Sequence, residues 1–186
     1  MKNKKWFILI IIGIIFICLA FLLLLYNKYE DEKAGQASQE ALEIIEENLE
    51  ATSLTEEVIN IEGNDYIGII NIPTLNLKLP VMSECTDKKM KLSPCRYYGS
   101  VQTNNFVICA HSYKNLFRYI KNLKSKEIVI YKDTLGNEYL YEVELIEILA
   151  PEEIEEMLES EFDLTLYTCT NDNQNRVTVR LNLLTE

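Results

Sequence analysis

The chain has 186 residues, 48% of them hydrophobic, and a formal net charge of −11 at pH 7. This length suits one domain with a single core plus a short additional segment. The acidic balance argues against a nucleic-acid-binding protein, because the phosphate backbone selects for basic surfaces.

The first segment, from Trp6 to Tyr26, contains no charged residue and is rich in Ile and Leu. It is long enough to cross a hydrocarbon core of about 30 Å. Lys2, Lys4 and Lys5 precede it, so the positive-inside rule places the N-terminus in the cytoplasm and the bulk of the chain outside. The alternative is a cleaved signal peptide, which would have a shorter apolar region and a small-residue cleavage site. The sequence after Tyr26 offers no such site, and we expect an uncleaved, single-pass anchor in the cell membrane.

Residues 27–62 form an acidic segment without proline. Between Ala34 and Leu49, apolar residues recur at roughly helical spacing with glutamates between them. We predict a short amphipathic helix over about residues 35–50, and the alternative is a solvated tether. The chain then divides into a cytoplasmic tail and transmembrane anchor at 1–26, an acidic, partly helical linker at 27–62 and a folded domain at 63–186.

The domain consists of short β-rich segments separated by turn signals. The first segment ends at Pro73, and the residues around Leu77 alternate between apolar and polar. The predicted strands are, in chain order, 66–72, 75–79, 105–110, 127–131, 139–148, 164–168 and 177–183. Residues 83–100 are rich in turn formers, and short helices are predicted at about 116–123 and 151–159. Seven or eight short strands with few helices predict a mainly β fold, a closed barrel of about eight strands behind the N-terminal transmembrane helix.

Four of the five cysteines have an interpretation that involves no catalysis. Cys18 lies in the apolar run, and Cys109 lies in an apolar strand as a core residue. Cys85 and Cys95 flank a lysine-rich stretch and would form a disulfide outside the cell, or would stay as two free thiols. A single histidine and the absence of a Cys-x-x-Cys pair argue against a zinc site. We expect no cofactor, and the scattered acidic residues do not define a calcium site.

The fifth cysteine, Cys169, and the only histidine, His111, lie at the ends of two predicted strands. A cysteine attacks a carbonyl as the thiolate, which a nearby imidazolium stabilises, and the imidazole then moves protons. The resulting oxyanion needs a fixed donor, and the guanidinium of Arg176 is a permanently charged one. A short loop between two antiparallel strands would bring Cys169 and Arg176 to the same end of the barrel. Arg180 competes for the third role, since strand alternation puts it on the same face, and we prefer Arg176 because it is nearer the loop.

Taken singly, each of these residues is more often structural than catalytic, but the local sequence around them strengthens the case. The segment 165–169, Thr-Leu-Tyr-Thr-Cys, resembles the Thr-Leu-x-Thr-Cys signature of the sortase family. The segment 175–180 is similar to the Arg-led strand after the nucleophile loop of sortases, and Ala-His at 110–111 to their Gly/Ala-His step. The segments 66–73 and 79–81 resemble the opening strands of the family.

The resemblance spans about residues 65–183 and implies a cysteine transpeptidase on a sortase-like barrel. Cys169 would attack a Leu-Pro-x-Thr-Gly-like sorting signal in a secreted protein and form a thioacyl enzyme. His111 would protonate the leaving amine, Arg176 would hold the substrate carbonyl and the oxyanion, and Thr168 would help to position the substrate. An amine of a peptidoglycan precursor or of a pilin would then accept the protein, at the surface of a Gram-positive cell.

Two departures from the family pattern affect the subclass. The loop between Cys169 and Arg176 is short, and no proline precedes Pro73, so the Asp-Pro-aromatic lid of many pilus-building sortases is absent. These features favour a class D-like or class B-like enzyme. The alternatives are another extracellular thiol hydrolase, which would share Cys169 and His111, and a non-catalytic anchored β-barrel module in which Cys169 is structural.

Overall fold

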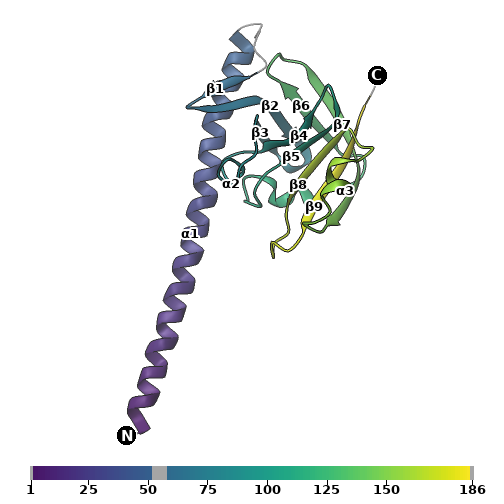
Figure 1. The fold of residues 1–186 in the computed structure, drawn as a ribbon. Coiled ribbons are helices and arrows are strands. Elements are labelled where there is room, and N and C mark those ends of the chain that lie inside the picture. Colours follow the sequence, from purple (N-terminus) through teal and green to yellow (C-terminus); the bar gives the residue numbers. More distant parts are fainter. Residues whose placement is uncertain (1, 52–57, 185–186) are drawn as a thin grey trace.

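A long N-terminal helix and a β-barrel beside its C-terminal half make up the protein (Figure 1). The computed structural model describes residues 2–51 and 58–184. The helices are α1 (Lys2–Ala51), η1 (Pro73–Leu75), α2 (Asp87–Met90), η2 (Phe117–Asn122) and α3 (Ile154–Leu158). The strands are β1 (Ile59–Ile61), β2 (Asn64–Ile72), β3 (Leu77–Met82), β4 (Cys95–Ser100), β5 (Asn104–Cys109), β6 (Ile128–Asp133), β7 (Glu138–Leu149), β8 (Leu164–Cys169) and β9 (Arg176–Leu183).

Eight of these strands close into a barrel. The sheet runs in the order β1-β2-β3-β4-β5-β8-β9-β7-β6, and a further antiparallel pairing of β2 with β6 joins its two ends. The short strand β1 only extends the edge of β2. Most pairs are antiparallel, but β3 runs parallel to β4 and β5 runs parallel to β8. The predicted closed barrel of about eight strands with short helices is therefore confirmed.

Barrel closure requires a close approach of two backbones at Gly68. A Cβ atom there would lie 2.3 Å from the carbonyl oxygen of Lys132 and 2.7 Å from the hydroxyl of Tyr131. That hydroxyl donates a hydrogen bond of 2.8 Å to the carbonyl of Ile67. Only glycine fits this position, because any side chain would push β2 away from β6.

The seven predicted strands correspond to β2, β3 and β5 to β9, and the prediction missed β4 and the short strand β1, which lies in the predicted linker. The region 83–100, predicted as turns, contains α2 and β4. Two register shifts interrupt the pairing of β4 with β5, so its apolar pattern does not alternate cleanly. The predicted helix at 151–159 is shorter, since Pro151 lies in the turn before α3. The predicted helical turns at 116–123 are the 3-10 helix η2.

The predicted short helix at 35–50 is part of a single helix that runs without a break from Lys2 to Ala51. No proline interrupts this stretch, so the backbone hydrogen bonds of the apolar run continue into the acidic segment. In the described part of the chain, α1 is the one helix long and apolar enough to cross a membrane. The division at residues 26 and 62 stays a prediction, and residues 52–57 of the predicted linker lie outside the described residues.

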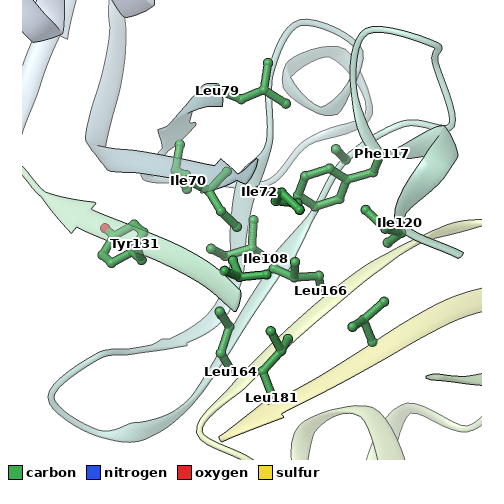
Figure 2. Packing of buried hydrophobic residues seen from close by; sticks show 14 of the residues in the cluster. Ile70, Ile72, Leu79, Ile108, Phe117, Ile120, Tyr131, Leu164, Leu166 and Leu181 are labelled. Atoms are coloured by element: carbon green, nitrogen blue, oxygen red, sulfur yellow. The ribbon is translucent and has the colours of Figure 1, made fainter. Parts of the chain in front are cut away.

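The core has two layers, one inside the barrel and one between its outer face and the helices. In Figure 2, side chains of β2, β5, β8 and β9 point toward one another inside the barrel, and Phe117 and Ile120 of η2 lie across its end. The outer layer includes Ala41, Leu42 and Ile45 of α1, packed with apolar residues of the strands. Burying one large aliphatic side chain contributes about 1.5–3 kcal/mol, so these contacts hold α1 against the barrel.

Candidate active site

The parallel pairing of β5 and β8 sets His111 beside Cys169. Cys109 of β5 pairs with Tyr167 of β8, and the amide of Ala110 donates a hydrogen bond of 3.3 Å to the carbonyl of Tyr167. Parallel strands end at the same edge of a sheet. The register continued by two residues brings the segment at His111 level with Cys169, on chains about 4.8 Å apart.

Strand β9 places Arg176 on the other side of Cys169. Cys169 and Arg176 are directly opposite each other in the antiparallel pair, so their side chains share one face of the sheet. The guanidinium carbon of Arg176 lies 5.5 Å from the ring centroid of Tyr167, two residues before Cys169. Because β8 lies between β5 and β9, the thiol is flanked by the predicted base on one side and the predicted cation on the other.

The side chain of Thr168 is on the opposite face from that of Cys169. Leu164 and Leu166 belong to the cluster inside the barrel, and alternation puts Thr168 on the same inward face. Thr168 is 2% exposed, and its hydroxyl donates a hydrogen bond of 2.8 Å to the carbonyl of Ala110. This bond ties β8 to β5 one residue before Cys169 and His111. The predicted contact of Thr168 with substrate stays a prediction.

Arg180 is buried among four hydrogen-bond acceptors. Its guanidinium donates to the carboxylate of Glu147 at 2.7 Å and to the hydroxyl of Thr165 at 3.0 Å. It also donates to the carbonyl oxygens of Glu156 and Met157, at 2.6 and 3.4 Å. Within the described residues, the Arg176 guanidinium makes no ion pair or hydrogen bond and lies over the face of the Tyr167 ring. Of the two candidate arginines, Arg176 is the one with donors available to a ligand.

His111 lines a cavity of about 600 Å³ at this end of the barrel. The backbone amide of His111 donates a hydrogen bond of 3.0 Å to the carbonyl of Met90, which fixes the chain after β5. Burial lowers the pKa of His111, and the positive charges of Lys91 and Arg118 lower it further, while the carboxylate of Glu30 raises it. The cavity is lined by Tyr26, Asn27, Glu30, Lys91, His111, Ser112, Tyr113, Arg118, Thr170, Asn171 and Asn173.

Comparison with known protein families finds a sortase domain over residues 70–184, more than half of the chain. The chain belongs to the sortase family. Its domain is therefore that of a cysteine transpeptidase. No curated protein matches the chain in sequence.

Solved structures similar to this sortase come from several classes. Sortase A from Corynebacterium diphtheriae has 25% identity and a TM-score of 0.58, with 66% of this chain and 62% of that chain covered. Sortase C1 from Streptococcus agalactiae has 25% identity and a TM-score of 0.60, with 71% and 73% covered. The sortase D5 transpeptidase of Clostridium perfringens has 23% identity and a TM-score of 0.62, with 83% and 99% covered. The subclass is not resolved, because the fold matches classes A, C and D.

Sequence reasoning missed the part of α1 that borders the site. Tyr26, Asn27 and Glu30 form one wall of the His111 cavity. The hydroxyl of Tyr113 donates a hydrogen bond of 3.1 Å to the carboxylate of Glu30. At the next residue of α1, the side-chain amide of Asn115 donates to the carbonyl of Asp31 at 3.3 Å. These contacts join residues more than 80 positions apart, so no local sequence signal could have revealed them.

The thiols of the sortase are all free in the described residues, so of the two alternatives that the sequence left open, Cys85 and Cys95 are not joined by a disulfide in the structure. Cys85 has its sulfur 3.0 Å from the sulfur of Cys109, not beside Cys95. The thiol of Cys95 donates instead to the carbonyl of Ser93 at 3.3 Å. No group of three or more His, Cys, Asp or Glu side chains in the described chain is arranged to hold a metal ion.

Proposed function

We propose that this sortase is a membrane-anchored enzyme that cleaves a Leu-Pro-x-Thr-Gly-like sorting signal and transfers the secreted protein to an amine. The observation that carries the proposal is the order of strands around Cys169. The half-buried thiol ends β8, His111 follows β5 on one side, and Arg176 begins β9 on the other. A nucleophile, a proton carrier and a fixed donor are then within reach of one scissile carbonyl.

In the first half of the reaction the Cys169 thiolate attacks the threonine carbonyl carbon of the signal, and a C–S bond forms. Arg176 donates hydrogen bonds to the carbonyl oxygen as negative charge develops there. The tetrahedral intermediate then collapses, and the C–N bond to the next residue breaks. The imidazolium of His111 gives its proton to the leaving amine, which leaves a thioester on Cys169.

In the second half an incoming amine attacks the thioester. His111, now neutral, takes a proton from this amine as the new C–N bond forms. The C–S bond breaks and the Cys169 thiolate is restored. The amine of a peptidoglycan precursor or a pilin lysine has the required chemistry, since both are nucleophiles that can reach an open site on a barrel end.

The position of α1 supports a substrate and an acceptor that are themselves held at the membrane. The predicted membrane segment ends at Tyr26, and Tyr26 also lines the His111 cavity. In Figure 1 the free N-terminal half of α1 extends from the barrel on the side of the β8–β9 loop. With the N-terminus in the cytoplasm, as Lys2, Lys4 and Lys5 indicate, the site lies outside the cell and close to the extracellular surface of the membrane.

The experiment that tests the proposal uses the full-length chain in detergent micelles and a panel of Leu-Pro-x-Thr-Gly and Asn-Pro-x-Thr-type peptides, read by intact mass. A peptide-sized adduct on the wild type that disappears in Cys169→Ala supports the proposal and reports the preferred signal. Cys18→Ala is the matched control and should keep the adduct. If no peptide forms an adduct although Cys169 reacts with iodoacetamide, the proposed substrate class is wrong.

A further inference from the structure

Two thiols outside the proposed mechanism lie against each other beneath the active site. Cys85 follows β3 and is half-buried, and Cys109, in β5, is fully buried. Their sulfur atoms are 3.0 Å apart, about 1 Å more than the ~2.05 Å of a disulfide bond. The backbone therefore already holds the two residues at a separation that a disulfide can bridge.

We propose that mild oxidation links Cys85 to Cys109 in a disulfide that fixes the chain under His111. The loop that this bond closes contains α2 and Met90, whose carbonyl accepts the hydrogen bond from the His111 amide. Cys109 is two residues before His111 and pairs with Tyr167, on whose ring Arg176 lies. The disulfide would therefore link the loop that hydrogen-bonds His111 to β5, the strand that pairs with Tyr167 beneath Arg176.

The surroundings favour this pair over the other combinations. Cys95 is also fully buried, but its thiol is directed to the carbonyl of Ser93, and it pairs with Cys109 only through the backbone of β4 and β5. Cys169 ends β8 two residues beyond Tyr167 and is separate from the cluster. Of the three clustered thiols, Cys85 is the one that solvent reaches, and its sulfur neighbour is Cys109.

The hydrogen bond between the two thiols also sets their order of reaction. The hydrogen bond between the two sulfurs lowers the pKa of Cys85 and raises that of Cys109, so Cys85 forms the thiolate first. The Cys85 thiolate attacks a small disulfide such as oxidised glutathione, forms a mixed disulfide and releases one glutathione thiolate. The Cys109 sulfur then attacks the Cys85 sulfur, loses its proton to the first thiolate released, and expels the second glutathione. Two protein thiols are oxidised and one glutathione disulfide is reduced.

The test is a peptide map of the full-length chain in detergent micelles. Samples are treated with oxidised glutathione or with dithiothreitol, alkylated and digested with trypsin. Cleavage after lysine and arginine puts the three cysteines on separate fragments, 79–88 with Cys85, 92–96 with Cys95 and 97–114 with Cys109. We expect the oxidised sample to contain fragment 79–88 linked to fragment 97–114. Cys169 should still react with the alkylating agent once any glutathione bound to it has been removed by brief reduction.

Three variants make the map decisive. Cys169→Ala removes the accessible thiol and should keep the link, and Cys95→Ser should also keep it. Cys85→Ser should abolish it. The linked form should unfold about 5–10 °C above the reduced form, the size expected for a loop of this length, and Cys85→Ser should lose that difference.

Either of two results would overturn the proposal: a link from Cys85 to Cys95, or Cys85 left as a glutathione adduct with Cys109 free. Neither readout uses a sorting signal, so the outcome is independent of the proposed transpeptidation. Only the formation of the disulfide in the cell depends on the proposed orientation, because oxidants are available to a domain that lies outside the membrane.

Discussion

The two ends of the β8–β9 strand pair carry the same chemical group in opposite surroundings. At one end Arg180 lies opposite Thr165, is 2% exposed and donates to four oxygen acceptors. At the other end Arg176 lies opposite Cys169, is partly exposed and rests on an aromatic ring. A buried guanidinium with four acceptors stabilises the fold, and one whose donors are free can bind a carbonyl oxygen. The comparison favours a structural role for Arg180 and supports the proposed role of Arg176 in transition-state binding.

The largest effect should come from the proton carrier at the open end. His111→Ala should lower the transpeptidation rate by about 10³- to 10⁴-fold, because no other side chain there can protonate the leaving amine. The barrel should still fold, since the backbone amide and carbonyl of His111 make its hydrogen bonds to Met90, Tyr113 and Phe117, and the substitution keeps them. Rates with a cleaved fluorogenic signal peptide, together with circular dichroism, would check this. If the variant folds and keeps the wild-type rate, His111 is not the proton carrier.

The next effect tests the open arginine. Arg176→Ala should lower the rate by about 10²- to 10³-fold, the usual loss when one oxyanion donor is removed. Thermal unfolding should change little, because the side chain is not buried in a network. Arg176→Lys is the matched control and should recover part of the rate, since it restores the charge but not the planar fork. If Arg176→Ala keeps the wild-type transpeptidation rate, the role proposed for Arg176 is wrong.

The third effect should be on stability and not on chemistry. Arg180→Met removes the buried cation, leaves the carbonyls of Glu156 and Met157 without their donor, and should cost about 3 kcal/mol of unfolding free energy. For a chain of this size that lowers Tm by about 6–12 °C. Glu147→Gln should cost less, because Glu147 is 37% exposed on its side chain. If Arg180→Met has the wild-type Tm but a much lower transpeptidation rate at temperatures well below Tm, the roles of the two arginines are reversed.

The smallest effect concerns the charge around His111. Lys91→Gln removes a positive charge that disfavours the imidazolium, so the pKa of His111 should rise toward its ordinary value of about 6.5. More imidazolium is then present at neutral pH, and proton donation to the leaving amine should increase. The chain has one histidine, so its imidazole resonance can be followed by NMR against pH without ambiguity. Lys88→Gln, three residues earlier in α2, is the control, and an equal shift there would rule out a specific effect of Lys91.

Sequence patterns predicted most of the barrel because strand periodicity is local. Segments such as 66–72 and 105–110 alternate or run apolar within a few residues, and the structure has strands there. Strand β4 was missed because its pairing with β5 is broken twice by register shifts, and its existence depends on a partner, not on its own pattern. The uninterrupted length of α1 was also missed. The boundary predicted at residue 26 follows the change from apolar to acidic residues, but the helical backbone continues through it.

The sequence by itself determined the apolar first segment, the nucleophile signature ending in Cys169, and the neighbouring strand ends that hold His111 and Arg176. Each of these depends on composition or on spacing over a few residues. Only the tertiary structure decided which arginine is buried among acceptors, that Cys85 meets Cys109 and not Cys95, and that α1 walls the His111 cavity. Those outcomes are contacts between residues 15 to more than 80 positions apart, and burial and hydrogen bonding at such distances are settled only when the whole chain has packed.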